Sequence, residues 1–112
     1  ERGVIRRSAV GNHLKNLYGY ACQISGIHLD KPNGPYAEAC HISTVGTPHN
    51  RPDEVQNVLC LSPTMHVFFD LGAISINDDL TLLGMEGRLN LKNEHDLSKK
   101  AFKYHRDNIF RE

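Results

Sequence analysis

The sequence predicts a single domain of the α+β class, and three observations support this prediction. The chain has 112 residues, which is enough for one hydrophobic core and too few for two. Apolar residues make up 39% and charged residues 23%, as in a folded domain. Short strand patterns in the middle of the chain lie between a helix pattern near each end.

The N-terminal part predicts a helix. Apolar residues at helical spacing place it over residues 9–18, with Ser8 as its N-cap. Residues 1–7 hold three arginines against one glutamate, so we expect a basic arm or the end of a linker there. Residues 20–24 favour a short strand.

The centre of the chain predicts a strand, a loop, a second strand and a helix, in that order. Residues 30–35 form a strong turn signal, and residues 36–42 favour an extended stretch. Residues 43–54 are rich in glycine, proline and asparagine, which is the composition of a loop. Residues 55–61 predict a buried strand, and residues 63–70 predict the helix.

Capping signals mark the ends of the later elements. Ser62 suits the N-cap of the central helix, Pro63 suits its first position, and Gly72 follows its end. Apolar stretches on both sides of residues 77–79 predict a β-hairpin. Residues 88–91 favour one more strand, and Ser98 opens a helix that reaches about residue 110.

Composition excludes several classes of protein. No apolar run approaches the roughly 20 residues of a membrane-spanning helix. The 13 basic and 13 acidic residues balance, so the overall charge does not indicate a nucleic-acid binder. The sparse cysteines at 22, 40 and 60 do not form a secreted disulfide framework. We therefore expect reduced thiols and a bacterial cytoplasmic location.

Four polar residues of the central elements have the chemistry of phosphodiester hydrolysis. His41 ends the first strand and can act as general base, provided that its pKa stays near neutral. His66 and Asp70 lie four residues apart on one face of the helix and can hold a divalent cation. Asn57 either binds that metal or fixes the loop that orients His41.

The blocks that contain these residues resemble a known family. They are Tyr36–Ile42, Pro48–Asp53, Asn57–Leu61 and His66–Asp70. Together they resemble the HNH endonucleases, named for a His…Asn…His pattern, and most of all the C-terminal nuclease domain of SRA-HNH modification-dependent restriction enzymes. The resemblance runs from about Tyr18 to Arg106. It implies a ββα-metal core within residues 8–112, with an N-terminal helix, a small additional hairpin and a C-terminal helix.

The resemblance also implies a function. It predicts a metal-dependent DNA endonuclease that uses Mg²⁺ or Mn²⁺, with His41, Asn57 and His66 as catalytic residues and His66, Asn57 and Asp70 as metal ligands. Possible partners are an SRA domain that recognises a modified base and a second copy of the chain; no membrane is expected. Two alternatives stay open: a catalytically inactive DNA-binding module, and an HNH nuclease of a toxin, homing or phage system.

We expect contacts with DNA from two basic segments. Arg6 and Arg7 belong to the N-terminal arm, and Arg51 belongs to the loop between the two strands. His49, in the same loop, either touches the phosphate or braces the loop.

Related domains often hold a structural zinc, and the resemblance identifies the matching positions here as Cys22, Ser25, Ser62 and Met65. Three of these four residues bind zinc poorly, so we expect no structural zinc. Cys40 stands where many relatives have a metal ligand, and we expect a buried structural cysteine there. The residues expected to fill the space of the zinc are Ile24, Ile27, Val58, Cys60, Leu61, Met65 and Phe69.

Overall fold

The structure of the chain is a computed structural model that describes residues 2–43 and 55–111, with side chains from residue 9 onward. Its elements, in chain order, are α1 (Arg2–Leu17), β1 (Leu29–Lys31), β2 (Gly34–Tyr36), β3 (Glu38–His41), a 3-10 turn (Val55–Asn57), β4 (Val58–Leu61), α2 (Pro63–Asp70), β5 (Ser75–Ile76), β6 (Leu82–Leu83) and α3 (Lys99–Asn108). This mixture of helices and small antiparallel sheets confirms the α+β class. None of the described helices is both long and apolar enough to cross a membrane.

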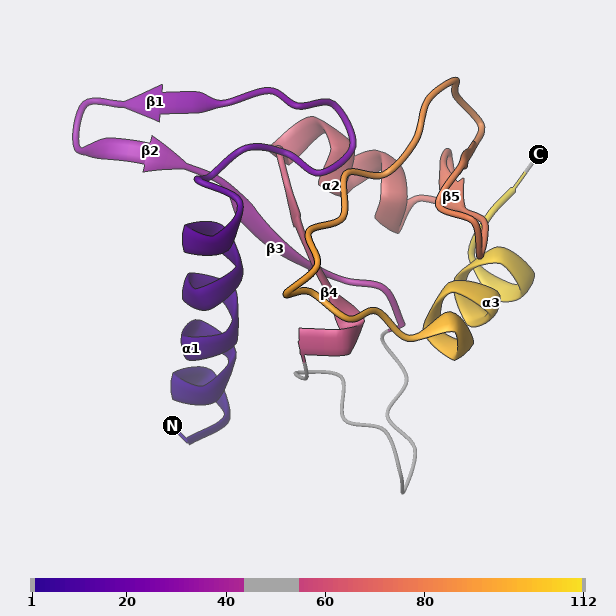
Figure 1. Ribbon diagram of the computed structural model, residues 1–112, viewed down its shortest axis with the longest axis horizontal. Coiled ribbons are helices and arrows are strands. Elements are labelled where there is room, and N and C mark those ends of the chain that lie inside the picture. Colours follow the sequence, from indigo (N-terminus) through magenta and orange to yellow (C-terminus); the bar gives the residue numbers. More distant parts are fainter. Residues whose placement is uncertain (1, 44–54, 112) are drawn as a thin grey trace.

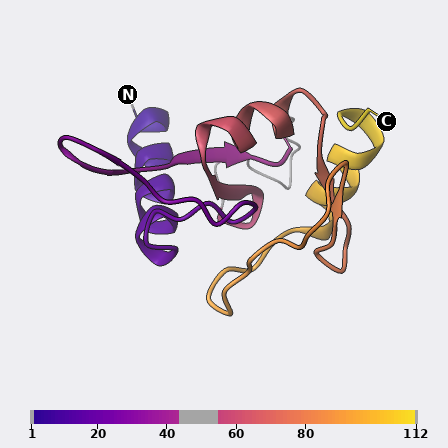
Figure 2. The same cartoon turned by 90° about the horizontal axis from the view of Figure 1, so that it is seen from above.

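The centre of the fold is the antiparallel pair β3–β4, followed directly by α2. Glu38 pairs with Leu61 at one end of this ribbon, and His41 pairs with Val58 at the other. In Figures 1 and 2, α1 and α3 lie at opposite ends of the molecule with β3, β4 and α2 between them. The predicted order of strand, loop, strand and helix is therefore the order in the structure.

The limits of α2 follow from its capping residues. The backbone of Ser62 is extended, and its hydroxyl accepts a hydrogen bond from the Met65 amide. Pro63 occupies the first turn, where its missing N–H is no loss. Gly72, at φ +82°, turns the chain away after the last turn, and a side chain there would collide with the backbone of Ile109. The predicted helix over residues 63–70 thus has the predicted limits.

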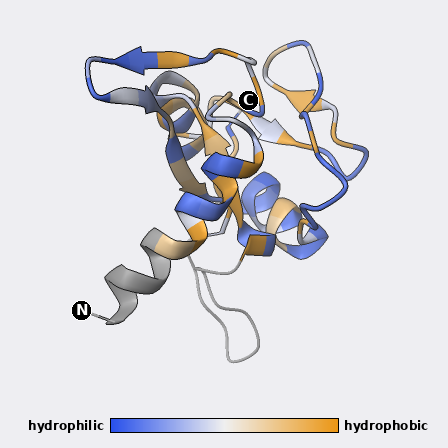
Figure 3. Ribbon diagram, turned by 60° about the vertical axis from the view of Figure 1, so that its left-hand side comes forward, coloured by the Kyte–Doolittle hydropathy of each residue, from blue (hydrophilic) through white to orange (hydrophobic). Residues whose placement is uncertain are grey.

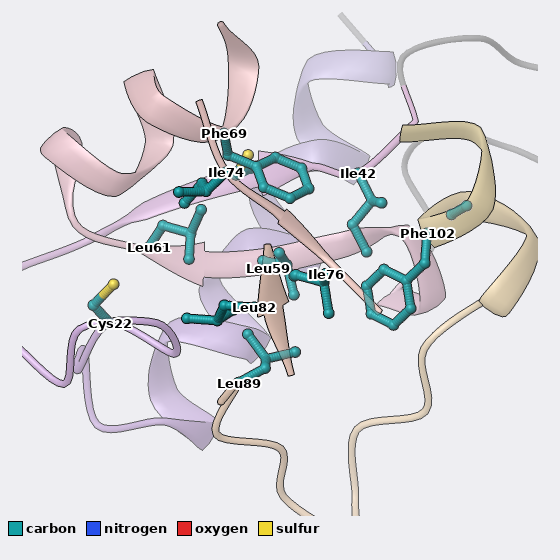
Figure 4. Packing of buried hydrophobic residues seen from close by; sticks show 12 residues of the cluster. Cys22, Ile42, Leu59, Leu61, Phe69, Ile74, Ile76, Leu82, Leu89 and Phe102 are labelled. Carbon is teal, nitrogen blue, oxygen red and sulfur yellow. The ribbon is translucent and has the colours of Figure 1, made fainter. Parts of the chain in front are cut away.

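All four residues of β4 are buried, because the strand is covered on both faces. On one face, Val58 and Cys60 pack against Leu14 of α1 and against Tyr18, which directly follows this helix. On the other face, Leu59 and Leu61 join the larger core, whose aromatic members are Phe69 and Phe102; Figure 4 shows this cluster. The continuous apolar run of β4 therefore follows from burial on two sides. Figure 3 shows α3 mostly in hydrophilic colours, and its buried residues are Ala101, Phe102 and His105.

The N-terminal helix is longer than predicted. It runs from Arg2 to Leu17, so Ser8 lies inside it and is not its N-cap. Gly11, which weakens helical propensity, sits where the helix comes close to β3: a side chain there would approach the Ala39 Cβ to 3.2 Å. The division into an arm of residues 1–7 and a domain of residues 8–112 stays a prediction.

Two predicted strands are reduced to single bridges. Within residues 20–24, only Ala21 forms a bridge, with His28, and within residues 88–91 only Arg88 forms one, with Thr81. The buried Gln23 explains the first case. Its backbone N–H and side-chain oxygen both bond to Cys60, and its backbone oxygen and side-chain amide both bond to Asn90. One residue thus joins these segments without a full strand.

The remaining elements differ in detail from their predictions. Residues 55–57 form a 3-10 turn, so only the second part of the predicted strand over 55–61 is extended. The turn signal of residues 30–35 lies within the antiparallel hairpin β1–β2. The hairpin predicted around residues 77–79 is β5–β6, with two residues in each strand. Ser98 caps α3 by accepting a hydrogen bond from the Ala101 amide, as predicted.

Candidate functional site

The imidazole of His66 lies between two carboxylates. Its Nδ1 is 2.8 Å from Glu38 Oε1 on β3, and its Nε2 is 3.1 Å from Asp70 Oδ2, one turn further along α2. The side chains of His66, Glu38 and Asp70 are 26%, 29% and 52% exposed, so the group opens to solvent on the Asp70 side. The predicted shared face of His66 and Asp70 is therefore present in the structure.

Cys40 completes a group of three possible metal ligands. Its Sγ is 3.7 Å from Asp70 Oδ1, and one ligand atom each of Cys40, His66 and Asp70 lies within 4.8 Å of the others. Glu38 and Cys40 are two residues apart on β3, so the alternation of the strand places both on one side of the ribbon. A nitrogen, an oxygen and a sulfur at this spacing form a donor set that fits a divalent cation.

The state of Cys40 decides how it takes part. Burial raises the pKa of its thiol far above the usual range, and the neighbouring Asp70 carboxylate raises it further. A neutral thiol is a weak metal ligand, but it can donate its proton to Asp70 Oδ1. His66 and Asp70 could therefore serve as ligands, while the Cys40 thiol contacts the Asp70 carboxylate. This agrees with the expectation of a buried cysteine at this position.

Asn57 joins the end of β3 to the start of β4. Its side-chain Oδ1 accepts a hydrogen bond from the Ser43 amide at 2.9 Å, and its Nδ2 donates to the Ser43 carbonyl at 2.7 Å. Its own carbonyl accepts from the amide of Ile42. These three bonds fix the backbone immediately after His41. Of the two roles left open by the sequence, the geometry supports that of fixing the loop.

His41 is the last residue of β3 and follows Cys40 directly. Its ring is half-buried, and the chain bends at the next residue, Ile42. Among the described residues it does not belong to the Cys40–His66–Asp70 group. His41 thus lies at the end of the β3–β4 ribbon and is the sequence neighbour of Cys40, one member of this group.

The predicted DNA contacts lie where the structure gives no side-chain positions. His49 and Arg51 fall outside the described residues, and Arg6 and Arg7 fall in the part of α1 described by its backbone alone. The backbone of Arg6 and Arg7 is helical. All four contacts stay predictions.

Glu38 was missed by the sequence analysis. It also accepts a hydrogen bond from the Tyr36 hydroxyl at 2.7 Å, through its second carboxylate oxygen. The signal that could have identified it is the alternation of β3, because Glu38 shares a face with Cys40. Glu38 pairs with the buried Leu61 of β4, and a partly buried carboxylate requires a polar partner.

The resemblance matches Cys22, Ser25, Ser62 and Met65 to the positions of a structural zinc. In the structure, the Cys22 sulfur makes a hydrogen bond within the protein. The Cys22 Sγ accepts from the Ser25 amide at 3.4 Å. Burial alone would raise the pKa of the Cys22 thiol, but hydrogen bonds from Ser25 and from the backbone of Ser62 lower it. Ser62 meanwhile caps α2, and Met65 packs against the larger core.

The list of residues expected to fill this space was partly wrong. Ile24, Leu61, Met65 and Phe69 do belong to the core that contains Cys22. Ile27 is half exposed, because it lies beyond the turn at Gly26. Val58 and Cys60 face α1 instead, as strand alternation requires for the neighbours of Leu59 and Leu61.

Comparison with known proteins agrees with this geometry. The model of an HNH endonuclease family matches residues 22–77, which is half of the 112-residue chain. This chain therefore belongs to the HNH endonuclease family. A solved structure described as a modification-dependent TagI restriction endonuclease is similar to 87% of the chain, with 34% sequence identity and a TM-score of 0.79. The match covers 36% of that protein, so the present chain spans about a third of its length. No curated protein matches the sequence significantly.

Proposed function

We propose that this domain hydrolyses phosphodiester bonds of DNA with the help of a divalent cation, as the nuclease part of a modification-dependent restriction system. The observation that carries the proposal is the group formed by Cys40, His66 and Asp70 directly beside His41. Nitrogen and oxygen ligands on one helix face, a buried thiol behind them and a histidine at the adjoining strand end suit this reaction.

The ligands that would hold the cation are His66 Nε2 and Asp70, which are 3.1 Å apart at their nearest atoms. Bound there, a cation supplies positive charge to the phosphate and to the leaving oxygen. A carboxylate binds both Mn²⁺ and Mg²⁺, whereas an imidazole nitrogen suits Mn²⁺ better than Mg²⁺, which prefers oxygen ligands. We therefore expect activity with both ions and higher activity with Mn²⁺.

His41 takes the proton of the attacking water, and Asn57 keeps His41 in position. The bonds from Asn57 to Ser43 and Ile42 fix the chain on the far side of His41, while the pairing with Val58 fixes its own backbone. A base held in this way loses little freedom when the substrate binds, and this favours reaction. A general base typically contributes about 10²–10⁴-fold to the rate.

The proposed setting rests on the similarity to the TagI restriction endonuclease, of which this chain matches about a third. Recognition of a modified base then belongs to another domain, such as an SRA domain, in the same or another chain. One active site of this kind cuts one strand, so a double-strand break needs two sites, and pairing of two copies on DNA would supply them. The formal net charge of zero agrees with a domain that depends on such partners for DNA affinity.

The test is nicking of supercoiled plasmid by the 112-residue chain with Mn²⁺, with Mg²⁺ and with excess chelator. We expect nicking with either metal, none in chelator, and a loss of about 10²–10⁴-fold in His41→Ala. The matched control is His28→Ala, because His28 is an exposed histidine outside the Cys40–His66–Asp70 group. Full activity in chelator would refute metal dependence. DNA binding without any nicking would favour the inactive binding module.

A further inference from the structure

We infer that Glu38 is a positioning residue of this site: it orients the His66 ring so that Nε2, and not Nδ1, faces the cation. The inference deepens the proposed function and rests on it. It is carried by the short contact between Glu38 Oε1 and His66 Nδ1, at 2.8 Å, together with the position of Asp70 on the other ring nitrogen.

The first step concerns the proton on the ring. An ionised carboxylate only accepts hydrogen bonds, so the contact with Glu38 requires a proton on His66 Nδ1. The nitrogen that remains for a metal is then Nε2, which faces Asp70 Oδ2 at 3.1 Å. A cation bound there would take the place of the proton that this second carboxylate contact requires in the metal-free chain. Glu38 thus selects the nitrogen that lies beside the second ligand.

The second step concerns the orientation of Glu38 itself. The Tyr36 hydroxyl donates to Glu38 Oε2 at 2.7 Å, so each carboxylate oxygen has its own partner. Tyr36 ends β2 and Glu38 begins β3, while His66 lies on α2. A chain of two hydrogen bonds therefore connects the strands to the ligand on the helix.

The third step compares this contact with a similar pair elsewhere. His28 Nδ1 and Asp30 Oδ1 are 3.7 Å apart, and their side chains are 44% and 73% exposed. That pair has a longer contact. In the part of the chain that the structure describes, no third residue hydrogen-bonds the Asp30 carboxylate, and the pair belongs to no group of possible metal ligands. Glu38–His66 is the tighter pair, and it adjoins a group of metal-binding side chains. A carboxylate on the outer nitrogen of a metal-binding histidine commonly fixes the ring and strengthens the ligand.

The test measures Mn²⁺ affinity by calorimetry in the 112-residue chain and in Glu38→Ala, Glu38→Gln and Asp30→Ala. We expect Glu38→Ala to weaken Mn²⁺ binding by about 10- to 100-fold. Glu38→Gln keeps an acceptor oxygen for Nδ1 and should lie between Glu38→Ala and the unchanged chain. Asp30→Ala removes the carboxylate of the comparison pair and should leave the affinity unchanged. Plasmid nicking by Glu38→Ala should recover at saturating Mn²⁺, because the residue acts through the ligand.

A second measurement does not depend on metal or activity. Long-range proton–nitrogen NMR spectra of the metal-free chain should show a proton on His66 Nδ1, and its signal should shift in Glu38→Ala. Unchanged Mn²⁺ affinity in Glu38→Ala, or an Nδ1 without a proton in the unchanged chain, would overturn the inference. Failure of the unchanged chain to nick DNA with any metal would instead refute the proposed function. Thermal melting of each variant identifies any loss of affinity that comes from unfolding.

Discussion

Histidines occur in two different settings in this molecule, at the partly exposed α2 site and at buried positions of the interior. His66 on α2 is partly exposed, and both of its ring nitrogens face carboxylates. His95 and His105 are buried, and each binds one hydroxyl and one backbone carbonyl. His95 contacts the Tyr18 hydroxyl at 2.7 Å and the Val55 carbonyl at 3.1 Å. His105 contacts Ser75 Oγ at 2.6 Å and the Phe69 carbonyl at 2.8 Å, and its ring stacks on that of Phe69.

The partners determine what each histidine can do. A hydroxyl that donates and a carbonyl that accepts satisfy a neutral imidazole completely, with one proton on the ring. Burial lowers the pKa of both His95 and His105, which favours this neutral form further. Carboxylates, by contrast, favour a positive charge between them, and at His66 this charge can be a metal ion. Seven histidines in one short chain therefore do not indicate seven functional residues.

The largest effect that this comparison predicts is on cleavage. Replacing His66 by Ala removes one of the two proposed ligands of the cation. A bound cation stabilises the transition state by several kcal/mol, so its loss should lower the cleavage rate at least about 100-fold. Thermal stability should change little, because the ring is partly exposed. The measurement is nicking rate against Mn²⁺ concentration, with melting of the same sample. Cleavage at the normal rate in His66→Ala would remove the distinction between the two kinds of histidine.

The next effect is on stability, in the core where α3 packs against Phe69 of α2. His105→Ala should lower the free energy of unfolding by about 2–4 kcal/mol, because it opens a cavity against Phe69 and leaves a buried hydroxyl and carbonyl without their partner. Urea denaturation measures this change. His28→Ala provides the control, since substitution of this exposed residue should stay within about 0.5 kcal/mol. A similar small effect for His105→Ala would show that its contacts do not stabilise the fold.

A smaller effect should appear in the pH dependence of stability. The pKa of His95 is lower in the folded chain than in the unfolded chain, where it is about 6.5. The unfolded state therefore binds more protons, so stability is complete above about pH 6.5 and falls as the pH drops below it. His105 acts in the same direction. Urea denaturation between pH 8 and pH 5 should show this fall, and His95→Gln should make it shallower. An equal slope in the variant would contradict a neutral buried His95.

The sequence predicted the parts of this molecule that local chemistry determines. The capping residues Ser62, Pro63 and Gly72 fixed the limits of α2, and the same helix carries His66 and Asp70 in the predicted relation. A helix turn brings residues four apart together whatever surrounds it. The order of the elements around His41 and Asn57 was predicted equally well, because it follows from local apolar patterns.

Contacts between distant segments could not be predicted in the same way. Glu38 lies 28 residues from His66, and only the register of β3 against β4 and the position of α2 bring them together. Gln23 likewise takes the place of a strand by binding Cys60 and Asn90. The early start of α1 was missed because the apolar pattern of residues 2–8 is weak, and the helix gains its stability from packing against β3 and β4 further along.

The smallest expected effect concerns Cys22. Like the rings of His95 and His105, its sulfur has a hydrogen-bond partner within the protein. Its Sγ accepts a hydrogen bond from Ser25, and Met65 packs nearby in the core, so removal of metal should not unfold the domain. We expect no resolvable change in melting temperature when a strong chelator is added to His66→Ala. That background removes the His66 ligand from the cation site, whose own occupancy would also affect melting. Metal analysis of the purified chain completes the experiment. A stoichiometric zinc that disappears in Cys22→Ser, or a large fall in melting temperature on chelation, would show that this corner depends on metal after all.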